Sequence, residues 1–200
     1  MGINKGFLAC DRTSKGDEVY TPFYAVDPII KYVPKDFVIW LPFDEKWSAF
    51  YQTFVSLGYK VIRSCLSEGK DFFDYVPIEH YDVIISNPPF SIKDSVLKRL
   101  YLLNKPFMIL LPITTLQGKE RYKYFENGIQ LLTFDSRIDY HTNGNFVSYT
   151  RGNHFGSAYF CRNILPKDLI IEKLTKYDKP LKKNNGQDNY NNNFDYCLFS

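Results

Sequence analysis

The chain has 200 residues, of which 44% are hydrophobic and 24% charged, and it contains 16 Tyr and 17 Phe. This length and composition are typical of one globular domain with a large core, and they exclude global disorder. No apolar run approaches the roughly 18 residues that a membrane span needs, and the first residues lack the apolar stretch of a signal peptide. We therefore expect a cytoplasmic protein without membrane contact. The formal net charge of +3 permits contact with nucleic acid but does not require it.

Short β-rich apolar runs alternate with longer segments of helical periodicity along most of the chain. In chain order, the pattern predicts a helix at 24–32, a strand at 37–41, a helix at 47–57, strands at 59–63 and 81–86, a helix at 91–103, a strand at 107–111, a helix at 114–127, and strands at 129–134 and 156–161. Several of these strands are apolar throughout, which is typical of strands buried on both faces. The sequence therefore predicts an α/β fold, doubly wound and Rossmann-like, with a mixed sheet between helices.

Two segments depart from this alternation. Residues 135–153, between two predicted strands, are rich in His, Asn, Thr, Gly and Arg with interleaved aromatics. We expect them to form an excursion that contacts substrate rather than the core. Residues 166–200 are expected to hold a C-terminal helix and a polar, Asn-rich tail, while residues 1–165 form one domain.

The sharpest motif is Asn87-Pro88-Pro89-Phe90, which directly follows the apolar strand predicted at 81–86. In open α/β sheets, ligands bind beyond the carboxyl ends of the strands, so this position favours a functional site. The two prolines donate no hydrogen bond and fix a rigid loop. The amide of Asn87 and nearby carbonyls are then left as acceptors beside the ring of Phe90. This combination suits a planar exocyclic amine; the alternative is a strand that merely ends at two prolines.

The motif resembles the (Asp/Asn)-Pro-Pro-(Tyr/Phe) signature of amino-group methyltransferases that use S-adenosylmethionine. The closest likeness is to the small adenine-N6 DNA methyltransferases of bacteriophages and bacteria, and it extends from about residue 17 to residue 161. The resemblance implies a class I methyltransferase fold, S-adenosylmethionine as cofactor and DNA as partner, in a bacterial or phage-infected cell. It also implies that Asn87, Pro88, Pro89 and Phe90 bind a target adenine that is flipped out of the duplex.

Tyr20-Thr21-Pro22 looks like the family's turn at the methionine end of the cofactor. The same residues suit the start of a helix, with Thr21 as N-cap and Pro22 as the first helical residue. As a capping signal alone, this pattern is common.

Pro42, Phe43 and Asp44 follow the strand predicted at 37–41 and resemble the family's first-strand motif, which also contacts the cofactor. In the family, this motif continues with glycines that let the backbone approach the cofactor. Here Glu45, Lys46, Trp47 and Ser48 follow, without a glycine.

The resemblance assigns the adenine end of the cofactor to Asp71 and Phe72. In the family, this Asp accepts a hydrogen bond from the adenine amine, and the adjacent aromatic packs on the ring. A surface Asp that caps a short turn is the alternative. The family's ribose-binding acid has no counterpart directly after the strand predicted at 59–63, and the nearest acid is Glu68.

Basic residues in two segments are candidates for contact with the nucleic acid. Lys119 and Arg121 lie in the helix predicted at 114–127, and Arg137 and Arg151 lie in the excursion. Basic side chains with interleaved tyrosines can bind phosphates and stack bases. A solvated basic face is the alternative.

We therefore expect an enzyme that methylates the N6 amino group of adenine in DNA. Methylation of RNA or of a protein amide is a second hypothesis, because similar loops occur in enzymes that modify ribosomal RNA and release factors. The third is a non-catalytic nucleic-acid-binding protein descended from a methyltransferase, which the missing glycines and the missing ribose acid favour. No metal is expected, because the four cysteines and three histidines lack ligand spacing.

Overall fold

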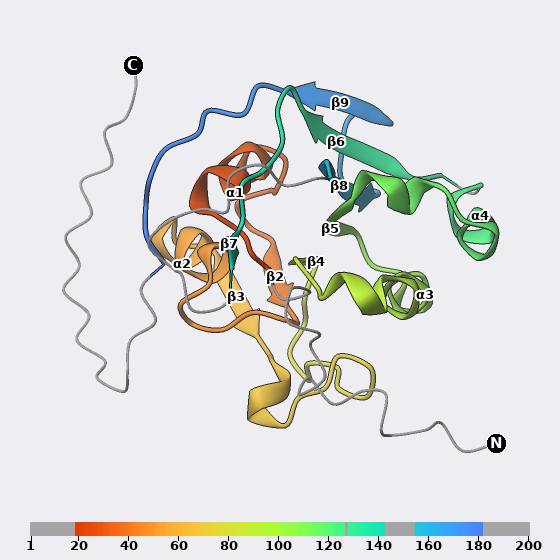
Figure 1. The fold of residues 1–200 in the computed structure, drawn as a ribbon. Coiled ribbons are helices and arrows are strands. Elements are labelled where there is room, and N and C mark those ends of the chain that lie inside the picture. The colour runs from red at the N-terminus through yellow and green to blue at the C-terminus, as the bar shows by residue number, and fades with distance from the viewer. Residues whose placement is uncertain (1–18, 127, 143–154, 182–200) are drawn as a thin grey trace.

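The computed structural model describes residues 19–126, 128–142 and 155–181, which form an α/β fold around a seven-stranded mixed sheet (Figure 1). The strand order is β3-β2-β4-β5-β8-β6-β9. Strands β2, β3, β4 and β5 are parallel, β8 is antiparallel to both β5 and β6, and β9 is parallel to β6. The strands span Val38–Leu41 (β2), Lys60–Arg63 (β3), Val83–Ser86 (β4), Phe107–Pro112 (β5), Gln130–Phe134 (β6), Ser157–Arg162 (β8) and Leu169–Glu172 (β9).

Helices cover both faces of the sheet, as the apolar strands predict. Successive residues of a strand point to opposite faces, and the core accordingly divides into two clusters. Ile39 and Ile85 face α1 (Phe23–Ile30) and α2 (Ala49–Ser56), whereas Trp40 and Ile84 face α3 (Lys93–Leu103). The short helix α4 (Lys119–Phe125) lies on the α3 side (Figure 1).

All six predicted core strands are confirmed, with boundaries that differ by one or two residues. The helix boundaries differ more. Helix α1 begins at Phe23 with Pro22 as its N-cap, so the expectation that Thr21 caps the helix is wrong. The segment expected to be one helix at 114–127 contains a 3-10 turn, η5 (Ile113–Leu116), and then α4 with Gly118 at its N-cap. The segment at 91–103 likewise opens with a 3-10 turn, η4 (Phe90–Ile92).

The expected C-terminal helix is absent from the described part of 166–200, where residues 169–172 form strand β9 instead. Their burial alternates, because Ile170 packs on the core while Leu169 and Ile171 are exposed. This period of two, with β-branched side chains, is typical of a strand. The tail beyond residue 181 lies outside the described residues.

A two-stranded ribbon that the sequence did not predict joins β1 (Val19–Tyr20) to β7 (His141–Thr142). It forms from the start of the expected excursion, in which Ile138, Tyr140 and His141 are fully or almost fully buried. The expectation that this segment avoids the core is therefore wrong for residues 138–141. Residues 143–153 of the excursion lie outside the described residues.

Candidate functional site

The sheet has a topological switch point between β2 and β4. The chain leaves β2 through α2 to β3 on one side, then crosses to β4 on the other side of β2. In such sheets, ligands bind where the carboxyl ends of the two central strands diverge. The segment after β2 carries Pro42, Phe43 and Asp44, and the segment after β4 begins with Asn87. The topology thus brings these two motifs to one edge of the sheet.

The amide of Asn87 is held in one orientation. Its Nδ2 donates to the backbone carbonyl of Val19 at 3.0 Å, and a carbonyl can only accept, so the amide oxygen must point the other way. That Oδ1 is buried and has no hydrogen-bond partner among the described residues. A buried acceptor without a partner is costly and uncommon in folded proteins. The fold therefore holds a buried acceptor without a hydrogen-bond partner directly after β4.

The rest of the motif forms the rigid turn that the prolines predict. Pro88 is buried and Pro89 half-buried, and Phe90 opens the 3-10 turn η4. The half-buried ring of Phe90 packs edge-to-face on Phe155 and Tyr140, with centroids 5.7 and 6.2 Å away. Its ring is thus braced from the side by two aromatics.

The β1 turn lies against this motif. The bond from Asn87 to Val19 ties β1 to the end of β4, and Tyr20 packs edge-to-face on Trp47 with centroids 4.9 Å apart. Thr21 is buried, and its Oγ1 has no hydrogen-bond partner among the described residues. A second buried polar atom without a hydrogen-bond partner thus lies in the segment that is bonded to Asn87.

Asp44 is a buried carboxylate that connects the two strand ends. Its Oδ2 accepts from the hydroxyl of Ser86, the last residue of β4. Burial raises the pKa of Asp44 from 3.8 to about 6, although the hydrogen bonds from Ser86 and Ser48 act in the opposite direction. Asp44 therefore carries its charge at neutral pH in a place where burial opposes ionisation.

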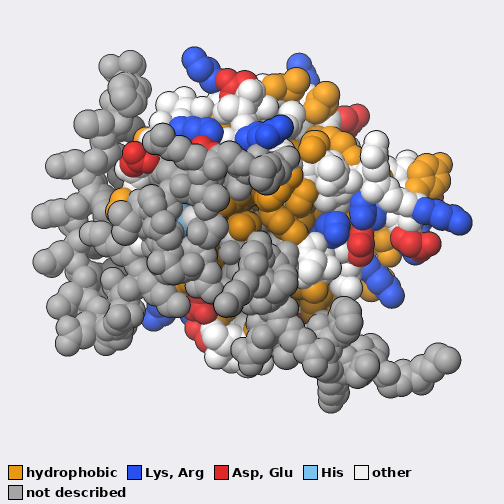
Figure 2. Space-filling model, viewed as in Figure 1, with side chains coloured by type: hydrophobic (Ala, Val, Ile, Leu, Met, Phe, Trp, Pro, Cys, Tyr) orange, Lys and Arg blue, Asp and Glu red, His pale blue; other side chains and the backbone are white. Residues whose placement is uncertain are grey.

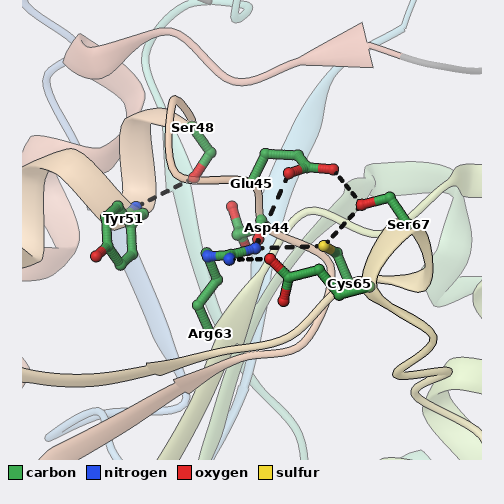
Figure 3. A network of polar contacts seen from close by, with 8 residues as sticks. Asp44, Glu45, Ser48, Tyr51, Arg63, Cys65 and Ser67 are labelled. Carbon is green, nitrogen blue, oxygen red and sulfur yellow. Dashed lines mark hydrogen bonds and ion pairs between the residues drawn. The ribbon is translucent and has the colours of Figure 1, made fainter. Parts of the chain in front are cut away.

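Arg63 occupies the end of β3, where the resemblance implies an acid (Figure 3). Its guanidinium donates to the backbone carbonyl of Asp44 at 3.2 Å and to Glu68, and it lies 3.9 Å from Glu45. Ser67 in turn donates to Glu45 at 2.7 Å. The two glutamates thus lie at the carboxyl ends of β2 and β3, but an arginine already binds them.

Asp71 and Phe72 both make contacts within the protein. Asp71 Oδ1 accepts from the backbone N–H of Phe73 at 2.9 Å, which is a turn cap of the kind that short Asp-containing turns form. Phe72 is buried and packs on Trp40 and Phe43, with centroids 5.5 and 4.9 Å away. The expected packing of Phe72 on the cofactor's adenine therefore stays a prediction.

Three of the four basic candidates lie in the described part of the chain, and they differ in exposure. Lys119 and Arg137 are exposed, whereas Arg121 makes hydrogen bonds within the protein and is largely covered. Arg151 lies outside the described residues. Figure 2 shows hydrophobic side chains near the centre of the visible face, with basic and acidic side chains mixed around α4 at the right. Charge alone therefore does not mark a nucleic-acid surface.

The residues at the switch point fit the polar and cationic parts of S-adenosylmethionine. Thr21 offers an unpartnered polar atom, and Asp44 offers a buried negative charge. The part of the chain that the structure describes contains no group of three or more His, Cys, Asp or Glu side chains arranged to hold a metal ion. Within the same residues, no helix is both long and apolar enough to cross a membrane.

Comparison with protein-family models gave no matching family, and comparison with curated proteins gave no matching sequence.

Proposed function

We propose that this protein is an S-adenosylmethionine-dependent methyltransferase that modifies the N6 amino group of adenine in DNA. The observation that carries the proposal is the buried, unpartnered Oδ1 of Asn87 at the switch point. An exocyclic amine is the donor that such an acceptor lacks. The mixed sheet, parallel except for β8, is compatible with the Rossmann-like methyltransferase fold that the sequence motif implies.

In this mechanism, the protein acts by orienting the amine. Asn87 Oδ1 and the carbonyl of Pro88 accept hydrogen bonds from adenine N6, which directs the nitrogen lone pair away from the protein acceptors. The ring of Phe90 stacks on the base. When bound, S-adenosylmethionine supplies an electrophilic methyl group. Fixed acceptors that need no reorganisation are an efficient form of catalysis.

The cofactor side is assigned to the segments after β1 and β2. Tyr20, Thr21 and Pro22 bind the methionine end, and Pro42, Phe43 and Asp44 line the adjacent strand end. The cost of ionising buried Asp44 supports a role in binding, because ionisable groups held in unfavourable environments cluster at functional sites. Asp71 remains the candidate for the adenine end.

One observation favours a second candidate, a nucleic-acid-binding protein without catalytic activity. Arg63, rather than an acid, ends β3, and the two nearby carboxylates, Glu45 and Glu68, form ion pairs with it instead of standing ready for ribose hydroxyls. Under this alternative, the site would have lost its cofactor while keeping the fold.

Two measurements separate these candidates. Calorimetric titration with S-adenosylmethionine should give saturable binding, and labelled methyl transfer should place the label in duplex DNA rather than in RNA or protein. Absence of cofactor binding would support the non-catalytic candidate. Label found only in RNA or protein would keep the reaction class and replace the substrate.

A further inference from the structure

Arg121 is used inside the protein as a clamp. Its Nε donates to the carboxylate of Asp94, and its Nη1 donates to the backbone carbonyls of Thr115, at 2.8 Å, and of Gln117. Only 15% of the Arg121 side chain is exposed. Nε and Nη1 of Arg121 therefore already donate to acceptors within the protein.

The clamp fits closely over Gly118. A Cβ atom at this position would lie 2.7 Å from Nη1 and 2.8 Å from Cζ of Arg121, closer than real Cβ contacts allow. A side chain here would force the guanidinium to move, and that movement would disturb its hydrogen bonds to Thr115 and Gln117. The glycine thus permits the arginine to lie flat against the turn that it closes.

The clamped turn joins η5 to α4 and follows the carboxyl end of β5, at the same sheet edge as Asn87. Two contacts connect it to the motif. Asp94 lies in the first turn of α3, shortly after Phe90, and the N–H of Ile113 donates to Gly156 at 2.9 Å, next to the aromatic that braces Phe90. Arg121 therefore ties the turn to the first turn of α3, the helix that follows the Asn87 loop.

This turn presents two neighbouring side chains to solvent. Leu116 is 38% exposed, and Gln117, the next residue, is also exposed. An amide that donates and accepts can read a base edge, and glutamine pairs well with adenine. An apolar side chain can occupy the space that a flipped base leaves in the duplex. Lys119 follows at the start of α4, where it can meet a phosphate.

We propose that the Leu116–Gln117 turn contacts the bases that flank the target adenine, and that Arg121 is the positioning residue that holds this turn. The inference rests on the proposed function and adds the part of the protein that selects sequence. It also replaces the expected phosphate contact of Arg121 with a role inside the protein.

The first experiment separates a positioning arginine from a phosphate contact. Arg121→Lys and Arg121→Gln are compared with Lys119→Gln in methyl transfer to duplex DNA over a range of salt concentrations. Lysine keeps the charge but cannot make the three-way contact. We expect both Arg121 variants to raise KM for DNA about tenfold, the scale of one lost base contact, with kcat and the salt slope unchanged. Lys119→Gln should reduce the slope by roughly 0.9 per lost phosphate contact.

A wild-type KM in Arg121→Lys together with a reduced salt slope in Arg121→Gln would overturn the inference, because a phosphate contact behaves in that way. Hydrogen exchange of residues 113–122 without DNA is the second readout. It should be faster in both Arg121 variants, and unchanged exchange would show that Arg121 does not hold the turn.

The second experiment tests sequence selection. A pool of duplexes with a central adenine and random flanking bases is incubated with wild type, Leu116→Ala, Gln117→Ala and the control Leu102→Ala, an exposed leucine on α3. We expect the flanking preference to change in the first two variants and to persist in the control. An unchanged preference in both would overturn the inference.

Failure of the proposed function is separately visible. If wild type binds the pool but transfers no methyl group to it, the proposed function fails. The contact between the turn and the flanking bases is then tested by sequencing the duplexes that each variant binds. A changed bound fraction in Gln117→Ala but not in Leu102→Ala would still support the contact, and identical fractions would overturn it.

Discussion

The carboxyl ends of β4, inside the sheet, and of β3, at its edge, differ in whether their polar groups have partners. At the end of β4, Asn87 leaves an acceptor without a partner, although its amide is anchored to Val19. At the end of β3, Arg63 binds its acidic neighbours, Glu45 and Glu68. At the same edge of the sheet, the end of β4 thus keeps an acceptor without a partner, whereas the acidic groups at the end of β3 are bound by Arg63. Under the proposed function, the end of β4 receives the target amine and the end of β3 must accommodate the cofactor.

Asp44 connects these two ends. It accepts from Ser86 at the end of β4, and its backbone carbonyl accepts from Arg63 at the end of β3. A substitution of Asp44 should therefore disturb the contacts at both strand ends. Substitution of a residue at only one of these ends should disturb that end alone.

Asn87→Ala removes the open acceptor. We expect methyl transfer to fall by about 10²–10³, by analogy with the loss of one preorganised donor from an oxyanion hole. Affinity for S-adenosylmethionine should remain close to wild type, because Asn87 faces the amine. Single-turnover kinetics and calorimetry measure the two effects, and wild-type turnover in the variant would remove Asn87 from the mechanism.

Asp44→Asn should show what the buried charge costs. The folded-state pKa of about 6 lies above the ordinary 3.8, so the favourable contribution of Asp44 to folding is complete below pH 3.8 and is lost as pH rises through 6. The free energy of unfolding of wild type relative to Asp44→Asn should therefore fall by about 2 kcal/mol between pH 4 and pH 7. Denaturant unfolding over this range measures the difference.

Asp82→Asn is the matched control, because its environment is the reverse. The backbone N–H of Val38 donates to Asp82 at 2.7 Å, and this bond, with that from His80, lowers the pKa of Asp82. Wild type should thus gain stability relative to Asp82→Asn as pH rises from the acid range and lose it as pH falls. The same slope in both variants would contradict the assigned cost of Asp44.

Asp71→Ala distinguishes a cofactor contact from a turn cap. We expect affinity for S-adenosylmethionine to fall by about 1–3 kcal/mol, the range for a lost hydrogen bond or an unpaired buried group. Asp74→Ala, three residues along the same turn and exposed, should leave this affinity unchanged. A lower Tm with unchanged affinity would show that Asp71 only caps its turn, as its bond to Phe73 does in the structure.

Arg137→Ala combined with Arg151→Ala should produce the smallest change. If each side chain neutralises one phosphate, the slope of log K against log salt flattens by roughly 0.9 for each. Melting temperature should change little, because Arg137 is exposed. An unaltered salt slope with a large loss of stability would show that these two arginines stabilise the fold and that DNA binds to another surface.

The strands were predictable because buried parallel strands are written as continuous apolar runs, such as Val83–Ser86 and Phe107–Pro112. Strand β9 was missed because its alternation is short and lies in a polar region, and β1 and β7 because each spans only two residues. Pairing of such short strands depends on tertiary contacts that no local pattern reveals.

The site was only partly predictable for a similar reason. The letters of the motif identified Asn87, but not the bond to Val19, which joins segments 68 residues apart and leaves Oδ1 open. Nor did composition distinguish Arg121, which is committed within the protein, from exposed Lys119. The Gly118-x-x-Arg121 spacing could have suggested an arginine folded over a turn, but only the structure shows which carbonyls it binds.

The most direct test is a structure of the protein bound to a duplex containing the preferred target and to a non-reactive analogue of S-adenosylmethionine. We predict an extrahelical adenine whose N6 lies within hydrogen-bond distance of Asn87 Oδ1, about 2.7–3.2 Å. An adenine that remains stacked in the duplex, with Oδ1 still without a donor, would contradict the proposal that this open acceptor is the catalytic site.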